Sequence, residues 1–179
     1  MIILFTGDGK GKTTAALGQM VRVLGRGKSA LMIQFIKGPW KSGEDEFAAK
    51  FLISNSKFLI HKLGLGFVGI LGDKLPKEKH IEAAEKALQY FREERGKNPP
   101  DGGWDLIVLD EINVALSLGL LKTEDVLAAI KDFPEDRILM LTGRGAPPEL
   151  IEVADLATEM KEIKHPYRDG KQGKPTVEF

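Results

Sequence analysis

The residues with the clearest chemical meaning lie near the N-terminus, in the run Gly7-Asp8-Gly9-Lys10-Gly11-Lys12-Thr13-Thr14. Glycines let a backbone turn tightly and point several N–H groups at one anion, and the start of a helix adds a partial positive charge. In such a loop Lys12 supplies a charge to phosphates, and Thr13 can offer its hydroxyl to Mg²⁺. The run therefore predicts a binding site for a nucleotide triphosphate, and for ATP in particular.

The spacing of the glycines differs from that of the usual phosphate loop. The usual pattern has a glycine five places before the glycine of Gly-Lys-Thr, and this place, counted back from Gly11, is Thr6. The glycine stands at Gly7 instead, so the loop is one residue tighter. This leaves two interpretations open: an altered register of the loop, or a different course of the triphosphate through it.

Two neighbouring carboxylates, Asp110 and Glu111, end an apolar run that begins at Leu106. In a parallel sheet, ligands bind beyond the carboxyl ends of the strands, so both acids would face the phosphate loop. They suit Mg²⁺, bound directly or through water. The alternative for the pair alone is an acidic turn or a helix cap, but the phosphate loop favours the metal site.

Two arginines are candidates for contact with phosphate. Arg144 has a glycine on each side at the end of another apolar run, and its planar guanidinium suits phosphate. The alternative is an exposed arginine in a turn. Arg22 follows Lys12 by ten residues on the same predicted helix. It could reach a phosphate or pair with an acid, and the spacing alone favours the salt bridge.

Other chemically interesting residues give weaker signals. Trp40 and Phe67 lie in the two segments least like scaffold, where either ring could stack on a planar ligand or simply pack. The histidines at positions 61, 80 and 165 have no ligand spacing, and we expect them to be structural or on the surface.

The composition gives no reason to expect binding to nucleic acid or to a membrane. Lys and Arg total 26, and so do Asp and Glu, so the net charge is zero. The absence of Cys excludes disulfides, thiolate metal sites and a cysteine nucleophile. No apolar run approaches the roughly 20 residues of a membrane helix, and the run Ile2–Phe5 ends too early for a secretory signal. These features predict a cytoplasmic protein.

The elements that must position these residues alternate between strands and helices. The apolar runs predict strands at Ile2–Phe5, Ala30–Ile36, Lys57–Leu63, Trp104–Glu111, Arg137–Thr142 and Leu156–Ile163. Helical periodicity predicts helices at Lys12–Gly25, Lys77–Arg95, Thr123–Asp132 with Thr123 as N-cap, and Pro147–Ala154. Loops are expected at Lys37–Asp45 and at the glycine-rich, mobile stretch Gly64–Gly72, a turn at Asn98–Gly103, and a polar tail from His165. The alternation predicts one α/β domain over residues 1–179, with a mostly parallel sheet and helices on both faces.

In this order, the motifs resemble those of the P-loop corrinoid adenosyltransferases of vitamin B12 biosynthesis. The matching stretches are Thr6–Gly18, Met32–Gly38, Val108–Asn113, Leu141–Gly145 and the ending from Lys164-His-Pro-Tyr through Val177-Glu-Phe179. The resemblance implies a P-loop NTPase fold of the RecA-like, three-layer type. It also makes the displaced glycine a trait of the family.

The resemblance further implies transfer of the 5′-deoxyadenosyl group of ATP to the Co(I) of a reduced corrinoid, with release of triphosphate. It implies Mg²⁺ or Mn²⁺, cobalamin or cobyrinic acid a,c-diamide as substrate, a homodimer and a flavoprotein reductant. It maps the family's phosphate-loop residues onto Gly7 through Thr14, its first-helix arginine onto Arg22 and its metal-binding glutamate onto Glu111. Lys12, Arg22, Arg144 and the metal ion would then neutralise the leaving triphosphate. Because Co(I) is itself a strong nucleophile, no protein nucleophile or base is required.

The stretch Gly66-Phe67-Val68-Gly69 departs from the family pattern. Some members have Gly-Phe-x-Trp, whose aromatics are thought to shape the corrinoid site, and this chain keeps Phe67 but lacks the Trp. Two alternatives in other functional classes stay open. One is a P-loop ATPase or small-molecule kinase, in which Asp110 or Glu111 positions a water or hydroxyl. The other is a non-catalytic ATP-binding module whose glycine-rich loop orders on binding.

Overall fold

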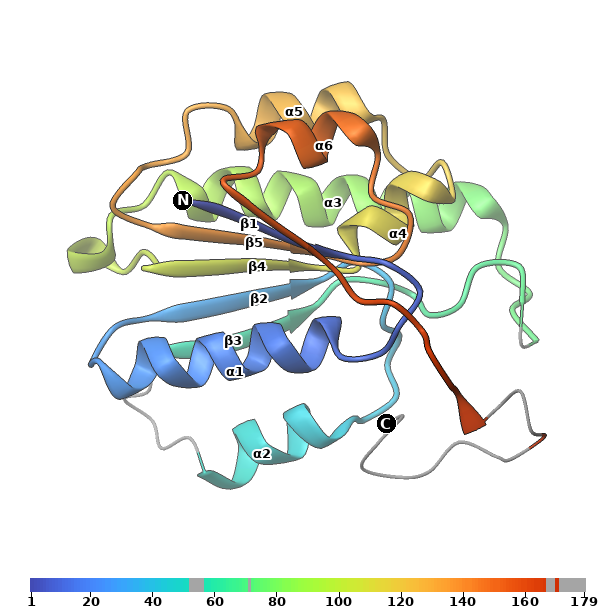
Figure 1. The fold of residues 1–179 in the computed structure, drawn as a ribbon, viewed down its shortest axis with the longest axis horizontal. Coiled ribbons are helices and arrows are strands. Elements are labelled where there is room, and N and C mark those ends of the chain that lie inside the picture. The colour runs from blue at the N-terminus through green and yellow to red at the C-terminus, as the bar shows by residue number, and fades with distance from the viewer. Residues whose placement is uncertain (52–56, 71, 167–169, 171–179) are drawn as a thin grey trace.

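The computed structural model describes residues 1–51, 57–70, 72–166 and 170. Its middle layer is a parallel sheet of six strands in the order β3-β2-β4-β5-β1-β6 (Figure 1). The strands are β1 (Ile2–Thr6), β2 (Ala30–Gln34), β3 (Phe58–Lys62), β4 (Leu106–Asp110), β5 (Ile138–Thr142) and β6 (Leu156–Glu159). This confirms the predicted α/β fold, which is of the P-loop NTPase type.

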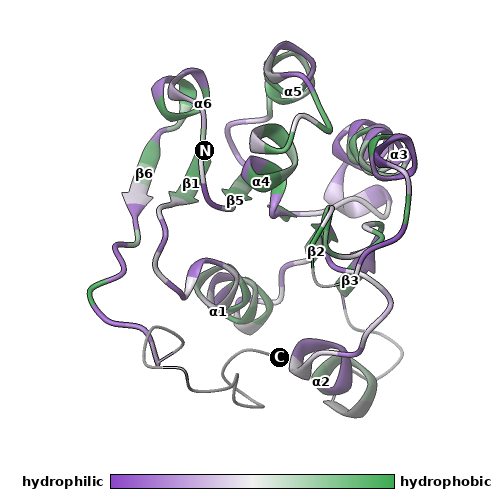
Figure 2. Cartoon of the chain, turned by 90° about the vertical axis from the view of Figure 1, so that its right-hand side faces the viewer, coloured by the Kyte–Doolittle hydropathy of each residue, from purple (hydrophilic) through white to green (hydrophobic). Residues whose placement is uncertain are grey.

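Helices cover both faces of the sheet (Figures 1 and 2). One face carries α1 (Lys12–Gly25) and α2 (Gly43–Phe51), and the other carries α3 (Lys77–Arg95), α4 (Ile112–Ser117), α5 (Thr123–Ile130) and α6 (Pro148–Val153). A short 3₁₀ helix, Pro99–Asp101, lies within the predicted turn before β4. The three-layer arrangement follows from these two helical layers.

Alternate side chains of the central strands enter two separate cores. In β4, Ile107 and Leu109 pack in the core under α3, α4 and α5, whereas Leu106 and Val108 pack against α1. Every residue of β2 and β4 is buried, as expected for strands covered on both faces. The two cores hold the carboxyl ends of β1, β2, β4 and β5 at one edge of the sheet, where the candidate residues lie.

Two of the observed helices, α2 and α4, were not predicted from the sequence, and the predicted N-cap of α5 is wrong. The helix α2 begins at Gly43, inside the expected loop, and has an acidic first turn that suits a helix N-terminus. The helix α4 has only six residues, too few to show a period. The residue before α5 is Lys122 rather than Thr123, and this helix start has no side-chain cap hydrogen bond.

Five of the predicted strands extend beyond the observed ones, most of all at the carboxyl ends of β2 and β6. The strand β2 ends at Gln34 and β6 at Glu159. Phe35 and Ile36, which extended the apolar run, belong to the core beyond the strand end. Apolar character therefore marked burial there and not sheet pairing.

Residues 64–70 and 72 form neither helix nor strand, which confirms the predicted loop. Its mobility stays a prediction. The family-like ending at Tyr167 and Val177–Phe179, and most of the polar tail, lie outside the described residues. Within the described ranges, no helix combines the length and apolar character that a membrane span requires.

Candidate active site

The loop between β1 and α1 encloses the side chain of its own lysine. Gly7 has a φ of 90° and Gly11 a φ of 110°, in the left-handed region that glycine adopts most readily. Lys12 is 6% exposed, and its Nζ donates to the carbonyls of Gly7 and Gly9, each at 2.7 Å. The ammonium therefore lies where the loop would meet phosphate.

Charged groups from three parts of the chain surround this ammonium. Burial lowers the pKa of Lys12, the carboxylate of Glu111 raises it, and the guanidinium of Arg144 lowers it further. Asp8 and Lys10 act on it from within the loop. The structure thus brings together most of the residues that the sequence assigned to the triphosphate.

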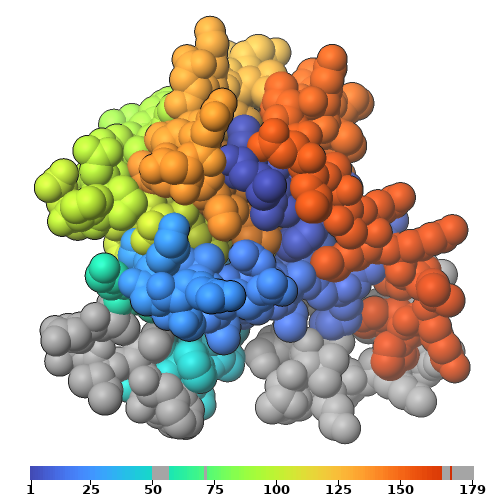
Figure 3. Space-filling view, turned by 60° about the vertical axis from the view of Figure 1, so that its left-hand side comes forward, coloured from blue at the N-terminus to red at the C-terminus, as the bar shows by residue number. Residues whose placement is uncertain are grey.

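The segment after β6 packs against the phosphate loop, and Figure 3 shows the C-terminal part of the chain, in orange, lying against the N-terminal part, in blue. The N–H of Gly9 donates to the carbonyl oxygen of Met160 at 2.6 Å. A Cβ at Gly7 would lie 2.5 Å from that oxygen, and one at Gly9 would lie 2.7 Å from it. Both glycines therefore have a packing role, which gives the displaced Gly7 a cause that the sequence did not show.

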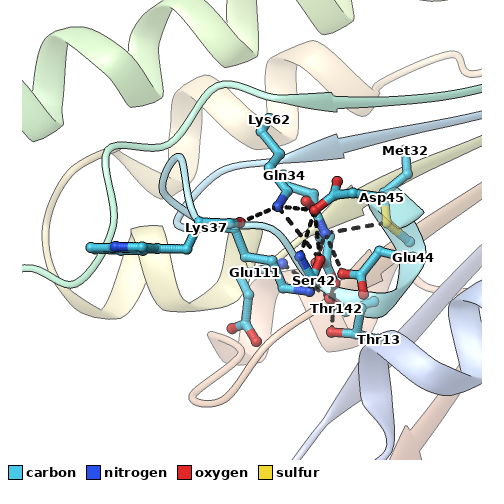
Figure 4. A network of polar contacts seen from close by, with 12 residues as sticks. Thr13, Met32, Gln34, Lys37, Ser42, Glu44, Asp45, Lys62, Glu111 and Thr142 are labelled. Atoms are coloured by element: carbon cyan, nitrogen blue, oxygen red, sulfur yellow. Dashed lines mark hydrogen bonds and ion pairs between the residues drawn. The ribbon is translucent and has the colours of Figure 1, made fainter. Parts of the chain in front are cut away.

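Asp110 is fully buried at the end of β4 and connects three other elements. Its Oδ1 accepts hydrogen bonds from the hydroxyls of Thr13, at 2.9 Å, and Thr142, at 2.8 Å. Its Oδ2 accepts from the amide nitrogen of Gln34 at 3.1 Å. Figure 4 shows these side chains, from α1, β5 and β2, converging on one point.

Glu111 sits in an unfavourable conformation and environment. Its φ of 63° is rare for a residue other than glycine. Burial raises the pKa of its carboxyl to about 7, the neighbouring Asp110 adds to this effect, and Lys12 opposes it. Strain of this kind costs roughly 1–3 kcal/mol and is concentrated at functional sites, as are displaced pKa values.

Thr13, Asp110 and Glu111 form a donor set that fits a divalent cation. Across the described ranges, no group of three or more His, Cys, Asp or Glu side chains is arranged to hold a metal by itself. Mg²⁺ keeps several waters and takes one or two carboxylates together with substrate phosphates. Two carboxylates and one hydroxyl beside a phosphate loop suit that mode of binding.

Arg144 projects from a braced loop after β5. Gly143 has a φ of 129° and Gly145 a φ of 68°. The buried Asn113 donates from its Nδ2 to the carbonyl of Gly143 at 3.1 Å. Arg144 itself is exposed, yet it is close enough to Lys12 to affect its pKa, so the structure brings it to the site.

Arg22 is not brought to the phosphate loop. It lies in the last turn of α1, exposed, and ten residues from Lys12 correspond to about 15 Å along a helix axis. The role that the resemblance gives Arg22 stays a prediction.

Phe67 pairs with Trp40 across two loops at this edge. Their ring centroids are 6.1 Å apart, and the side chains are 43% and 63% exposed, respectively. The Trp40 ring packs against Gly38 and Gly66, where an added Cβ would lie 2.6 Å and 2.7 Å from it. Two glycines thus hold a large aromatic ring in a mostly exposed position.

Sequence reasoning assigned no role to Gln34, Thr142 or Asn113. Each is a fully buried polar residue. The available signal was a polar residue that ends, or closely follows, an apolar strand. Of the histidines, His80 is buried and paired with Asp73 at 3.0 Å, and His61 packs edge-on against Tyr90, which agrees with structural roles.

Comparison with known proteins places these features in a family. The whole chain, residues 1–179, matches the family described as ATP:corrinoid adenosyltransferase BtuR/CobO/CobP. It is 37% identical over 179 residues to a corrinoid adenosyltransferase of Pseudomonas aeruginosa, covering all of this chain and 83% of that protein. The corresponding protein of Sinorhizobium sp. is 39% identical over 181 residues, and that of Escherichia coli K12 is 30% identical over 183 residues. Both alignments cover all of this chain, and 80% and 85% of those proteins.

Proposed function

We propose a role for each residue of this site, on the basis that the chain belongs to the ATP:corrinoid adenosyltransferase family. The chain is therefore a transferase that moves the adenosyl group of ATP to a corrinoid. Cobalt attacks the 5′ carbon of ATP, and the triphosphate leaves whole. The protein's part is to orient two substrates and to stabilise charge on the leaving group. Orientation alone can contribute roughly 7–11 kcal/mol to such a reaction.

Lys12 and Arg144 neutralise the leaving triphosphate, held by the backbone of Gly7 through Thr14. The observation that carries this assignment is the buried Lys12 ammonium inside the loop, with Arg144 close by. Arg22 belongs to the proposal on the resemblance alone. Lys12→Ala should abolish adenosyl transfer, whereas Lys86→Ala, at an exposed lysine of α3, should not. An active Lys12→Ala protein would show that the phosphate site lies elsewhere.

Thr13, Asp110 and Glu111 hold Mg²⁺ or Mn²⁺. Because the Thr13 hydroxyl donates its proton to Asp110, its oxygen lone pairs remain for a cation. When bound, the ion neutralises part of the triphosphate charge. The residues' own part is to fix its place beside the phosphate loop.

The triphosphate takes an altered course through the tightened loop, so that the 5′ carbon faces the corrinoid. What supports this is a cavity of about 390 Å³ on the β6 side, lined by Gly9, Lys10 and residues 161–166, which include lysines at 161 and 164 and one acid, Glu162. A phosphate chain directed there leaves the adenosyl end toward β2 and β3. A structure of the ATP complex with the γ-phosphate in the ordinary P-loop position would rule this out.

The exposed rings of Trp40 and Phe67 hold a face of the corrin. They supply flat apolar area on loops that follow β2 and β3, at the edge where ligands of parallel sheets bind. Trp40 here takes the place of the Trp missing from the Gly-Phe-x-Trp stretch.

Trp40→Ala should raise KM for the corrinoid several-fold and leave KM for ATP unchanged. The matched control is Ile151→Ala, which removes an exposed apolar side chain from α6 on the opposite face. Equal changes in both KM values would contradict a corrin contact. A homodimer, a flavoprotein reductant, cobalamin or cobyrinic acid a,c-diamide as substrate, and a cytoplasmic location complete the proposal.

A further inference from the structure

Gln34 is a buried polar residue to which the reaction described above gives no task. The strand β2 is apolar from Ala30 to Ile33 and then ends with Gln34, whose side chain has no exposed surface. In the pairing of β2 with β4, Gln34 lies opposite Asp110. A buried amide costs stability unless its donors and acceptor are paired, so its hydrogen bonds indicate what it does.

The amide nitrogen of Gln34 lies between two carboxylates (Figure 4). Its Nε2 donates to Asp110 Oδ2 at 3.1 Å and to Glu44 Oε1 at 3.4 Å. The reversed amide would turn its oxygen toward both acids, so the network determines this orientation. The Oε1 atom is buried and has no hydrogen-bond partner in the part of the chain that the structure describes. An apolar side chain would pack there without burying an unpaired oxygen. We therefore conclude that the function of the amide lies in its hydrogen bonds to the two acids.

Of the two acids, Asp110 is the one next to the phosphate loop. Among the described side chains, Gln34 is the sole hydrogen-bond donor to Asp110 Oδ2, while Oδ1 accepts from Thr13 and Thr142. Without the amide, the carboxylate could rotate and weaken its bond with the Thr13 hydroxyl. Glu44, at the start of α2, has its own ion pair with Lys37.

We propose that Gln34 is a positioning residue of the cation site, an inference that rests on the function proposed above. It holds the Asp110 carboxylate so that Thr13 donates its proton to Asp110 Oδ1 and presents its oxygen to the divalent cation that accompanies ATP. Gln34 acts through Asp110 and contacts neither ATP nor the corrinoid.

The test measures ATP affinity by calorimetry with Mg²⁺ and with EDTA, so it does not depend on adenosyl transfer. Gln34→Met keeps the length of the side chain and removes the donor. A hydrogen bond to a charged group makes a large contribution, so we expect the gain in ATP affinity from Mg²⁺ to fall roughly tenfold or more. The affinity in EDTA should change less than about twofold. Glu44→Gln is the matched control, because it leaves the Gln34–Asp110 bond in place, and it should keep the gain.

An unchanged gain from Mg²⁺ in Gln34→Met would overturn the proposal. So would an equal loss of affinity with and without Mg²⁺, since that indicates a general structural role. In an Asp110→Asn background, Gln34→Met should have no further effect on the gain, whereas additive effects would also contradict the proposal. If Gln34→Met does not fold, Gln34→Asn, which is polar but one carbon shorter, is measured in the same way.

Discussion

Replacing Gly9 with alanine tests whether the segment after β6 packs on the phosphate loop. A Cβ at Gly9 would lie 2.7 Å from the carbonyl oxygen of Met160 and 2.8 Å from the carbonyl carbon of Lys161. These are backbone atoms, so they cannot rotate away as a side chain could. The substitution must therefore separate the loop from the segment.

We expect Gly9→Ala to lower the free energy of unfolding by about 1–2 kcal/mol. Overpacking costs about 1–3 kcal/mol, and loss of the Gly9 to Met160 hydrogen bond adds about 0.5–1.5 kcal/mol. The smaller entropy of the unfolded alanine chain returns about 0.4–1 kcal/mol. Because the segment after β6 can move away from the loop and relieve the overpacking, we expect a total loss in the lower part of the range that these contributions give. At about 2–4 °C per kcal/mol for a chain of this size, Tm should fall by roughly 2–8 °C.

Thermal unfolding followed by circular dichroism measures this change, with Gly18→Ala as the matched control. Gly18 lies inside α1 and is exposed, and a Cβ there meets nothing within 4 Å. Alanine in a helix interior is better than glycine by about 0.5–1 kcal/mol, so this variant should gain stability. The same chemical change should thus shift Tm in opposite directions at the two positions. A Tm for Gly9→Ala at or above that of the wild type would refute the packing of the segment on the loop.

Three further predictions concern charge. Glu111→Gln should stabilise the nucleotide-free protein above pH 7, because burial raises the pKa of Glu111 to about 7 from 4.5. The gain in the free energy of unfolding should reach about 3 kcal/mol at most and vanish below about pH 4.5. Urea unfolding at a series of pH values measures it, and a gain that does not vary with pH would contradict the prediction. Burial would raise the pKa of Asp105, but hydrogen bonds from Ser29 outweigh this and lower it. Asp105→Asn should therefore lower the free energy of unfolding by roughly 1.5–3 kcal/mol at pH 7, and its difference from wild type should shrink as the pH falls below about 4. A difference that persists at low pH would exclude the charge of Asp105 as its cause. Arg144→Leu should lower kcat for adenosyl transfer at least roughly tenfold through loss of a charge near the leaving group, and steady-state rates equal to wild type would remove Arg144 from the site.

The sequence predicted the sheet, four of the helices and the phosphate loop, because each rests on a local pattern. The alternation of apolar runs with 3.6-residue periods indicates parallel strands joined by helices. The run Gly7–Thr14 was recognisable from its glycines and Lys12 alone. The acids at Asp110 and Glu111 were placed correctly because the ends of parallel strands share one edge.

What the sequence could not show depends on contacts between distant segments. Met160 lies against Gly7 and Gly9 only because β6 pairs with β1. The Trp40–Phe67 pair joins two loops of irregular structure, and no periodicity describes such loops. The amide bridge of Gln34 needs the register of β2 with β4, which apolar runs alone do not determine, since every side chain in both strands is buried.

The products formed from ATP test the central claim most directly. The protein is incubated with ATP, Mg²⁺ and chemically reduced cobalamin, and both the corrinoid spectrum and the phosphorus-containing products are followed. The account predicts adenosylcobalamin and intact triphosphate in equal amounts. ADP and phosphate, or no adenosylcobalamin, would contradict it.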